Sequence, residues 1–502
     1  MTHILIEAGP GSGKTTTLKL AYNFLLSAQY QFIPTQEQIN ICYEMNQFRG
    51  IAPTQIVFIA FNRSIADRMR ESLPQSTKSY TFGGLGQSVL FKRHHFQQLD
   101  KYRGQKLLSQ ILGKDLKHLT YQERITYLNL LRYISACKEE LLPPTAESFQ
   151  HIYEKYNLPL PPENVELAVR LLNLMRVPND MIEYIDQVWM GLQSITKPIY
   201  KLAFIDEAQD LSALRLEFCL KVAENVVFCG DPFQAINAFA GADHLAFEKL
   251  RRICSISLPL KTSFRLPPNH IKYANKIRPI NILPYKTEDG PIESITLQDL
   301  PKKLSSFLTG EATPETSYTF PLGIDPKDPS NHLMIARTNA ELFQVAIFLL
   351  KHRIPTKVVR RQEDEDIAAV VLNYFEQLTK RASIPITLLK QTLKQEMIKA
   401  ENMPFRQGTH LYEKASCLLS LAEESREVAD IPVLIRTITA DREGVRACTI
   451  HKSKGLEAPF IYILFPPIAH PRATSPIEIE QERNLELVSE TRSQYYKAYV
   501  KN

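Results

Sequence analysis

The sequence lacks several features that mark specialised classes of protein. No apolar run approaches the roughly 20 residues of a membrane-spanning helix, and the chain has no internal repeat and no low-complexity segment. Its seven cysteines never form a Cys-x-x-Cys pair, which disfavours a zinc ribbon or an iron–sulfur centre. The first residues already have the pattern of a strand, so we expect no signal peptide. Together these absences favour a cytoplasmic protein with reduced, mostly buried thiols.

The bulk composition is that of an ordinary globular protein. A length of 502 residues predicts roughly three or four structural units. Hydrophobic residues make up 44% and charged residues 23% of the chain, so sizeable cores are expected. The net charge of +6 permits binding to nucleic acid without demanding it, and an enzyme with no nucleic-acid substrate fits this charge equally well.

A glycine-rich loop near the amino terminus is the most informative motif. An apolar strand pattern (residues 4–7) leads into Ala-Gly-Pro-Gly-Ser-Gly-Lys-Thr (residues 8–15) and then into a helical pattern (residues 16–26). This context distinguishes a phosphate-binding loop from a structural glycine-rich turn, although Ala8 stands where the strict pattern has glycine. Backbone N–H groups would face the phosphates, Lys14 would reach the β- and γ-phosphates, and the Thr15 hydroxyl would hold Mg²⁺. The predicted nucleotide contacts are Ala8, Gly9, Gly11, Ser12, Gly13, Lys14, Thr15 and Thr16.

Strand patterns recur along the chain with segments of helical length between them, which predicts parallel α/β sheets. The strand patterns are residues 55–61, 202–205, 226–229, 333–336, 448–450 and 460–464, and a last helix is expected around 482–492. The predicted fold class is α/β, with two parallel-sheet cores that each carry a mainly helical insertion. The expected parts are a first core (1–92 and 199–260) with insertion 93–198, and a second core (261–360 and 447–502) with insertion 361–446.

Two adjacent carboxylates, Asp206 and Glu207, end the strand pattern at residues 202–205. At the carboxyl end of a parallel strand they would lie on the same edge of the sheet as the phosphate-binding loop. Asp206 then suits the Mg²⁺ shell through water, and Glu207 suits a base that orients or deprotonates the attacking water. An Asp-Glu pair alone more often begins a solvated helix, but its place after a phosphate-binding loop favours the catalytic interpretation.

The phosphate-binding loop and the string Asp-Glu-Ala-Gln-Asp at 206–210 together resemble superfamily 1 helicases of the UvrD/Rep/PcrA type. Further segments resemble that family's other motifs, in the family's order along the chain. They are residues 61–66 (motif Ia), 81–86 (Thr-Phe-Gly-Gly-Leu-Gly, with Gly83 in place of a histidine), 230–236 (motif III), 260–265 (motif IV), 449–457 (motif V) and 485–492 (motif VI). The resemblance implies two RecA-like cores, with ATP and Mg²⁺ as cofactors.

The resemblance also assigns roles to single residues. For catalysis it implies Lys14, Asp206, Glu207, Gln234, Arg265 and Arg492. Among these, Gln234 would sense the γ-phosphate, and the two arginines would be arginine fingers whose approach makes hydrolysis depend on closure. Phe264 would stack on the adenine, Glu457 would contact the ribose, and Thr15 with Asp206 would hold Mg²⁺.

For nucleic acid, the resemblance implies bases stacked on aromatic side chains, which tolerates any base sequence. Phe61 and Phe239 would supply the rings, although a place in the core is the alternative for both. The remaining strand contacts are expected at Asn62, Thr81, Thr449 and His451. A basic cluster at residues 91–95 either lines the strand path or forms a solvated helix face.

The chain departs from the family on the adenine side and in its second insertion. A glutamine-bearing segment usually precedes the phosphate-binding loop, whereas here a similar string, Thr-Gln-Glu-Gln at 35–38, follows the helix of that loop. Either Gln36 or Gln38 is a candidate to reach the base, and Thr16 occupies a position that often carries an arginine. We therefore hypothesise a looser preference for ATP over other nucleotides. The short insertion 361–446 would suit a strand translocase with weak or partner-dependent unwinding.

The leading interpretation is an ATP-driven motor that tracks along single-stranded DNA, 3′ to 5′ by resemblance, and unwinds duplexes. Its expected partners are single-stranded and forked DNA, with a possible protein partner in a repair, replication or defence complex and no membrane. The alternative is a nucleotide-switched DNA-binding ATPase subunit of a larger complex, without processive unwinding. A small-molecule P-loop kinase is a weaker alternative because it leaves the later motifs unexplained.

Overall fold

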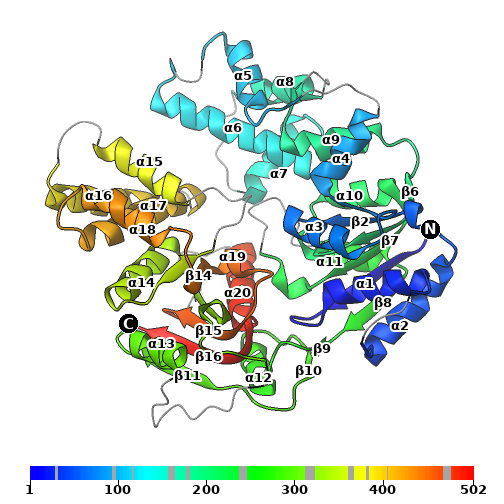
Figure 1. Ribbon diagram of the computed structural model, residues 1–502. Helices are drawn as coiled ribbons and strands as arrows, with labels where there is room; N and C mark the ends of the chain where they lie inside the picture. Colours follow the sequence, from blue (N-terminus) through cyan, green and yellow to red (C-terminus); the bar gives the residue numbers. More distant parts are fainter. Residues whose placement is uncertain are drawn as a thin grey trace. The chain divides into compact units, whose positions relative to one another are not determined.

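The structure is a computed structural model that describes residues 1–28, 32–92, 98–115, 118–156, 164–176, 181–236, 246–310, 321, 323–359, 367–379, 384–403, 405–466 and 476–502. The chain divides into two compact units, Met1–Lys261 and Thr262–Asn502. Each unit is built on a six-stranded sheet with parallel strand pairs (Figure 1). The predicted α/β fold class with two parallel-sheet cores is therefore confirmed. No helix within the described ranges is long and apolar enough to cross a membrane.

The sheet of the first unit places the glycine-rich loop where the strand order reverses. Its strands are β1 (His3–Ala8), β2 (Ile56–Ala60), β3 (Lys78–Thr81), β6 (Tyr200–Ile205), β7 (Ala223–Gly230) and β8 (Ile256–Leu260). They lie in the order β3-β2-β6-β7-β1-β8, so β1 pairs with both β7 and β8. Ligands of open parallel sheets bind beyond the carboxyl ends of the strands at such a reversal.

Both faces of this first sheet are covered, which explains the apolar runs in the sequence. The covering helices include α1 (Lys14–Leu25), α2 (Gln36–Glu44), α3 (Arg63–Ser72), α4 (Phe82–Phe91), α10 (Ala213–Val222) and α11 (Ala246–Ile253). Along β1, Ile4 and Ile6 belong to an apolar cluster with Leu18 of α1, whereas Leu5 belongs to a second cluster with Phe82 of α4. Alternate side chains of a strand point to opposite faces, so a strand buried on both faces is apolar throughout.

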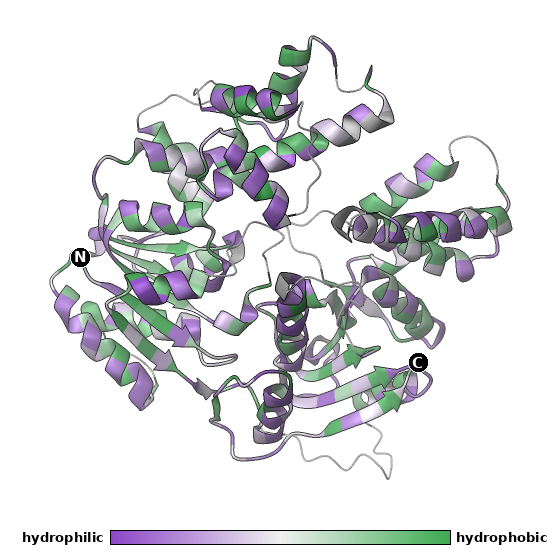
Figure 2. Cartoon of the chain, turned by 180° about the vertical axis from the view of Figure 1, so that it is seen from behind, coloured by the Kyte–Doolittle hydropathy of each residue, from purple (hydrophilic) through white to green (hydrophobic). Residues whose placement is uncertain are grey.

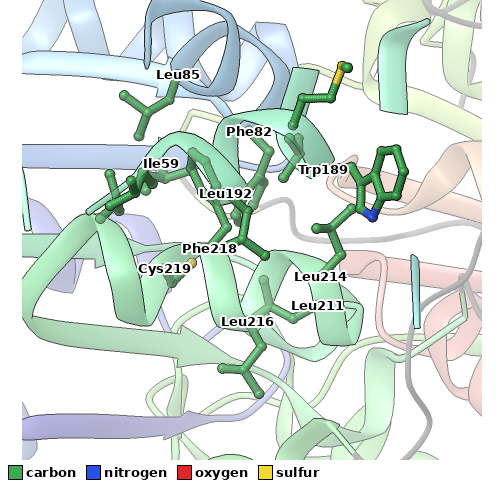
Figure 3. Packing of buried hydrophobic residues seen from close by; sticks show 14 of the residues in the cluster. Ile59, Phe82, Leu85, Trp189, Leu192, Leu211, Leu214, Leu216, Phe218 and Cys219 are labelled. Atoms are coloured by element: carbon green, nitrogen blue, oxygen red, sulfur yellow. The ribbon is translucent and has the colours of Figure 1, made fainter. Parts of the chain in front are cut away.

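The first insertion is helical and shares its core with the sheet. It contains β4 (Gln98–Leu99), α5 (Arg103–Leu112), α6 (Tyr121–Glu139), α7 (Ala146–Tyr156), α8 (Val165–Met175), β5 (Met181–Ile182) and α9 (Tyr184–Ser194). Figure 3 shows Phe82 and Leu85 of α4 in one apolar cluster with Trp189 and Leu192 of α9. The insertion is thus fastened to the first sheet by hydrophobic packing.

A buried ionic cluster sits inside this insertion. The Asp186 carboxylate accepts from Arg103 Nη1 at 2.8 Å and from Lys138 Nζ at 2.7 Å, and all three side chains are almost completely buried. Removing one partner of a buried pair leaves an uncompensated charge and typically costs about 3–5 kcal/mol. The cluster therefore binds α5, α6 and α9 to one another.

The second unit repeats the parallel-sheet plan. Its main strands are β11 (Ile292–Thr296), β12 (His332–Ala336), β13 (Thr356–Val358), β14 (Val445–Thr449), β15 (Ala458–Leu464) and β16 (Ser493–Lys501), in the order β11-β16-β15-β12-β14-β13. A separate pair is formed by β9 (Thr262–Ser263) and β10 (Leu283–Pro284). Its other helices are α12 (Pro268–Ile277), α13 (Leu300–Thr309), α14 (Asn339–Lys351), α19 (Ile450–Ser453) and α20 (Pro476–Glu490). The helix expected at 482–492 is α20, and it ends before Arg492.

The second insertion is a group of helices that packs on α14. These helices are α15 (Ile367–Thr379), α16 (Ile386–Glu401), α17 (Phe405–Glu423) and α18 (Asp430–Ile438). Phe343, Ala346 and Ile347 of α14 lie in one apolar cluster with residues of all four helices. The hydropathy colouring in Figure 2 shows hydrophobic residues concentrated on the sheet strands, with mixed colours on the helices.

Candidate nucleotide and nucleic-acid sites

The glycine-rich loop has the backbone conformation that a phosphate cradle requires. Gly11 and Gly13 take left-handed φ angles of 71° and 76°, which glycine adopts without strain. The loop is anchored because Gly9 N donates to Leu260 O at 2.9 Å and Ser12 Oγ donates to Gly9 O at 2.8 Å. Helix α1 begins at Lys14, so the first N–H groups of this helix, which have no partner within it, face the loop. The predicted contact residues from Ala8 to Thr16 therefore form one continuous structure.

The two predicted catalytic carboxylates lie beside this loop. Asp206 follows β6 directly, and its Oδ2 accepts from Thr15 Oγ1 at 2.7 Å. Its Oδ1 accepts from the Glu207 backbone N–H at 2.9 Å. Mg²⁺ in nucleotide sites is bound by one or two protein oxygens together with phosphates and waters. The adjacent Thr15 hydroxyl and Asp206 carboxylate fit that role.

A hydrogen-bonded chain runs from Glu207 to Gln234 through residues to which the sequence assigned no role. The buried Gln209 carboxamide donates to the Glu207 carboxylate and accepts from Asp231 N at 2.9 Å. Asp231 Oδ2 in turn accepts from Gln234 Nε2 at 2.8 Å. A Cβ atom at Gly230 would come within 2.5 Å of Gln209 Oε1, so the glycine makes room for this chain. Gln209 and Asp231 stand inside the quoted motif strings, which is the signal that could have identified them.

One cation, Lys14, and three carboxylates lie close together at the loop and shift one another's pKa. Burial would lower the pKa of Lys14, but the carboxylates of Glu207, Asp231 and Asp206 outweigh it and raise the pKa. Burial, with the charge of Glu207, raises the pKa of Asp206 to about 6, against the opposing effects of Thr15 and Lys14. Burial also raises the pKa of Asp231. Perturbed carboxylates of this kind cluster at functional sites.

The two candidate glutamines for the base are engaged in local hydrogen bonds. Gln38 is buried, and its Nε2 donates to Thr17 Oγ1 of α1 at 3.0 Å while its Oε1 accepts from Thr35 N. Gln36 is exposed and donates to Asn40 Oδ1 at 2.9 Å. Gln38 therefore holds α2 against the helix of the phosphate-binding loop, and Thr16 on that helix is exposed.

The predicted strand contacts of the first unit lie at the carboxyl ends of β2 and β3. Phe61 is half-buried, and the Arg215 guanidinium lies 5.3 Å from its ring centroid. Asn62 caps α3 by accepting from Ile65 N at 2.9 Å. Thr81 caps α4 by accepting from Gly84 N at 3.1 Å. Phe239 lies outside the described residues, as does most of the basic cluster at 91–95, whose residues 93–95 are not described.

In the second unit, the predicted ATP-side residues gather where strands begin. Glu457 precedes β15 and Arg492 precedes β16, so both lie at the amino edge of the sheet. Arg265 Nε donates to Glu457 Oε2 at 2.5 Å, and Arg265 Nη1 donates to Thr491 O at 3.0 Å. Burial raises the pKa of Glu457, but the Arg265 guanidinium overcomes this and holds it below its ordinary value.

Arg492 is almost completely buried within the second unit. Its Nε donates to Val488 O at 2.8 Å, and its Nη1 donates to Leu456 O at 3.3 Å. Its Nη2 donates to Thr491 Oγ1 at 3.2 Å. The side chain therefore joins the end of α20 to the segment before β15, in addition to any action on a phosphate.

The predicted strand contacts of the second unit lie at the opposite, carboxyl edge of its sheet. Thr449 ends β14, and His451 is the second residue of the short helix α19 (Ile450–Ser453). Burial, with the nearby Arg337, lowers the pKa of His451 to about 4, so this ring is neutral at pH 7. Arg337 follows β12 and forms a two-bond ion pair with Glu482 of α20, at 3.1 and 2.6 Å. A neutral His451 would contact a phosphate by hydrogen bonding and not as a cation.

A comparison with known protein families assigns the chain to one of them. Residues 1–254 match the UvrD/REP helicase N-terminal domain. This match covers half of the chain, and it contains the phosphate-binding loop, Asp206, Glu207 and Gln234. The chain belongs to the UvrD/REP helicase family.

Curated relatives are remote and longer than this chain. The chain is 22% identical to "ATP-dependent DNA helicase HMI1, mitochondrial" of Saccharomyces cerevisiae over 403 residues, which cover 72% of this chain and 51% of the relative. It is 23% identical to "F-box DNA helicase 1" of Gallus gallus over 238 residues, which cover 44% of this chain and 22% of the relative. The chain thus spans about half or less of the length of these relatives. Among solved structures, Arterivirus nonstructural protein 10 (helicase) is 10% identical with a TM-score of 0.32, covering all of this chain and 59% of that one.

Proposed function

We propose that the protein is an ATP-dependent DNA helicase or single-strand DNA translocase that moves 3′ to 5′. Family membership supports the helicase class. The observation that supports coupling of ATP hydrolysis to strand binding is the series of hydrogen bonds that joins Glu207, Gln209, Asp231 and Gln234. This series of hydrogen bonds begins at Glu207, the predicted base for ATP hydrolysis. It extends to Gln234 in the motif III segment, whose continuation at 237–245 includes the predicted stacking ring Phe239. A change at the γ-phosphate can therefore be transmitted to the residues that would hold the strand.

The proposed chemistry assigns separate tasks to the residues of the first unit. Lys14 and the loop N–H groups would bind the phosphates, and Thr15 with Asp206 would hold Mg²⁺. Bound Mg²⁺ would supply a charge that stabilises the transferring phosphoryl group. Glu207 would orient the attacking water and accept its proton, and Gln209 would keep that carboxylate in place. Arg265 and Arg492 are proposed as the arginine fingers, with Phe264 and Glu457 on the base and the ribose.

The substrates and setting follow from the same proposal. We infer single-stranded and forked DNA as substrates, with Phe61 and Phe239 stacking on bases and Asn62, Thr81, Thr449 and His451 on the strand backbone. A protein partner in a repair, replication or defence complex is compatible with the family. The free cysteines, all but one of them buried, support a reducing compartment such as the cytoplasm.

A second candidate is a nucleotide-switched DNA-binding ATPase without processive unwinding. The observation that favours it is the second insertion, which is packed on α14 as part of one apolar cluster. An insertion held in this way would restrict duplex opening to a partner-assisted reaction. Strand-stimulated hydrolysis without displacement of any annealed strand would support this candidate over a processive helicase.

The first experiment is steady-state ATP hydrolysis by the full chain with no nucleic acid, single-stranded DNA, duplex DNA or single-stranded RNA. Strong stimulation by single-stranded DNA that disappears in Lys14→Ala is the expected result. Hydrolysis that is indifferent to every nucleic acid would contradict the helicase proposal. GTP is compared in the same assay, because hydrolysis of ATP alone would overturn the hypothesis of a loose nucleotide preference.

A further inference from the structure

An arginine on α10 lies between a predicted strand-contacting ring and the first insertion, all within the first unit. The Arg215 Cζ atom lies 5.3 Å from the centroid of the Phe61 ring. Its Nη2 donates to Glu139 Oε1 at 3.0 Å. A planar guanidinium can cover a ring and pair with a carboxylate at the same time, whereas the compact ammonium of a lysine cannot do both. Arg215 therefore joins the end of β2 to the end of α6.

Each charge of this ion pair is unfavourable in the helix that carries it. Arg215 lies in the first turn of α10, where its backbone N–H donates to the capping Ser212 hydroxyl at 3.3 Å. Glu139 is the last residue of α6. Helix dipoles favour anions at the amino end and cations at the carboxyl end, so both residues oppose the dipole of their own helix. Their contact with each other compensates for both placements.

The carboxylate of the pair is buried. Glu139 is 8% exposed, and within the described part of the chain its Oε2 atom has no hydrogen-bond partner. The Arg215 side chain is 21% exposed. Because a buried carboxylate needs its cation, Glu139 restricts where the guanidinium can lie. A residue of the insertion thereby fixes the arginine that covers Phe61.

The Phe61 ring lies at the edge of the first sheet and outside the core. Phe61 follows β2 directly and is half-buried, and the next residue, Asn62, caps α3. As far as the described residues show, neither apolar cluster of the first unit includes Phe61. Since the Arg215 guanidinium covers one face of the ring, the opposite face is the one that a base would use.

We propose that Arg215 is a positioning residue for single-strand binding, which holds the Phe61 ring for a base while Glu139 holds Arg215. The inference rests on the proposed function, in which Phe61 stacks on single-stranded DNA. It extends the strand site to α6 of the first insertion. A ring that is already held loses less conformational freedom when a base binds to it. A shift of α6 would move Arg215 and alter the affinity for the strand without any change at the phosphate-binding loop.

The test measures the affinity of the full chain for a fluorescein-labelled oligothymidylate by anisotropy, without nucleotide. Arg215→Gln removes the cation, Phe61→Ala removes the ring, and a third variant carries both substitutions. Arg251→Gln is the matched control. Arg251 also pairs with a carboxylate, Glu7, and lies 5.9 Å from the centroid of Phe247, a ring within the core. The melting temperature is measured for each variant.

We expect Phe61→Ala to weaken strand binding by about tenfold and Arg215→Gln by about fivefold. The two losses should not add, because the arginine acts through the ring. Arg251→Gln should bind the strand like the wild type. A loss for Arg215→Gln that persists in the Phe61→Ala background would overturn the proposal, because Arg215 would then contact the strand itself. The salt dependence would identify that case, since one lost phosphate contact lowers the log–log slope by about 0.7.

Substitutions at Glu139 test the part played by the insertion. Glu139→Gln should weaken strand binding by about threefold, because the guanidinium is no longer held. The variant carrying both Glu139→Gln and Arg215→Gln buries no unpaired charge, so it separates loss of positioning from loss of the fold. It should melt close to the wild type and bind the strand as weakly as Arg215→Gln. Wild-type affinity in either Glu139 variant would overturn the proposal.

The wild-type protein separates this inference from the proposed function. If single-stranded DNA neither binds to the wild type nor stimulates its ATP hydrolysis, the proposed function fails and the inference fails with it. Wild-type binding that Arg215→Gln leaves unchanged overturns the inference alone. Equal weakening by Arg215→Gln and Arg251→Gln, with equal falls in melting temperature, also overturns the inference alone, because a general loss of stability would then explain both.

Discussion

At the scale of single residues, Glu207 stands out because its backbone is left-handed, with φ of 55°. A residue other than glycine in this conformation costs on the order of 1–3 kcal/mol and persists only when its surroundings fix it. The hydrogen bond from Gln209 is one of the interactions that fix it. Gln209 is therefore a positioning residue for the predicted base.

Gln209→Glu tests this role with little change of size. The new carboxylate would repel both Glu207 and the nearby Asp231, so the predicted base would lose its orientation. We expect kcat to fall by about a hundredfold while the affinity for ATP changes little. Single-turnover hydrolysis and nucleotide binding measure the two effects separately. Gln87→Glu is the control, since Gln87 bonds to Gln187 away from the loop; a kcat unchanged by Gln209→Glu would contradict the assignment.

Asp206 provides a prediction about stability and pH. Its pKa is raised from 3.8 to about 6, so the folded protein binds this proton more tightly than the unfolded chain does. The stabilising contribution is therefore complete below pH 4 and is lost as the pH rises through 6. Asp206→Asn removes the charge, and at pH 7.5 without nucleotide it should increase the free energy of unfolding by about 1–3 kcal/mol. Urea unfolding at several pH values measures this.

The same substitution should abolish ATP hydrolysis, because an amide cannot replace the carboxylate beside Mg²⁺. A more stable but inactive variant is the signature of a strained functional site. Asp67→Asn is the control, because Asp67 is an exposed partner of Arg70. A destabilised Asp206→Asn variant would show that the carboxylate serves the fold more than the site.

A substitution at Arg492 can distinguish a structural role of this side chain from a catalytic one. Its bonds to Val488 O and Leu456 O give it a structural task that its place in the sequence did not reveal. Arg492→Lys keeps one cation but not the forked geometry, so we expect kcat to fall by about a hundredfold or more while the fold survives. Arg446→Lys is the control. Arg446 donates to Glu457 O, which lies next to the Leu456 O that accepts from Arg492 in the segment before β15. Equal losses in both variants, matched by equal falls in melting temperature, would favour a purely structural role.

At the scale of elements, the sequence predicted best where a strand is apolar and ends in a motif. The patterns at residues 4–7 and 202–205 correspond to β1 and β6, because both strands are buried on both faces. Strand β16 was missed although it lies between β11 and β15. Its Lys497 is fully buried and pairs with Glu490 at 2.5 Å, so a charged residue interrupts the apolar pattern of a central strand. The burial of Lys497 is explained by its pairing with Glu490, which only the folded structure reveals.

The crossing of α4 and α9 is a second feature that local patterns did not reveal. The string Thr-Phe-Gly-Gly-Leu-Gly resembles a family motif that predicts a strand contact at Thr81, and its last residue, Gly86, lies against Gln187 of α9. A Cβ atom at Gly86 would come within 2.2 Å of Gln187 O. The glycine at this position is therefore required by helix packing, whatever the strand contacts of Thr81.

Gly86→Ala should destabilise the first unit by about 1–3 kcal/mol or more, because the obstructing atom belongs to the backbone. Gly84→Ala in the same helix is the matched control. Its Cβ would meet the side-chain atom Thr81 Oγ1 at 3.3 Å and Tyr80 at 3.9 Å, so a small shift of a side chain relieves the contact and the loss of stability should be much smaller than at Gly86. Calorimetric melting of both full-length variants compares them. Equal stability of the two variants would contradict the close crossing.

At the scale of the whole molecule, α14 contributes side chains to two apolar clusters of the second unit. Leu342, Val345 and Leu349 belong to the cluster with the sheet, whereas Phe343 and Ile347 belong to the cluster with the second insertion. Polar bonds strengthen the second contact, since Asn339 Nδ2 donates to Glu413 Oε1 of α17 at 2.7 Å. A helix buried on both sides cannot separate from either partner without exposing apolar surface. We therefore expect the insertion and the second sheet to move as one body.

A reversible crosslink tests this expectation. The variant carrying Asn339→Cys and Glu413→Cys is joined by a reducible bis-maleimide, and each single variant is treated in the same way as a control. If the contact persists through the cycle, strand-stimulated ATPase and translocation should stay within about twofold of the untreated protein. Loss of translocation that returns on reduction, with nucleotide binding intact, would show that the insertion must leave α14 during each step. That outcome would also weaken the nucleotide-switch alternative, because an insertion that releases during each ATP cycle is available for duplex opening.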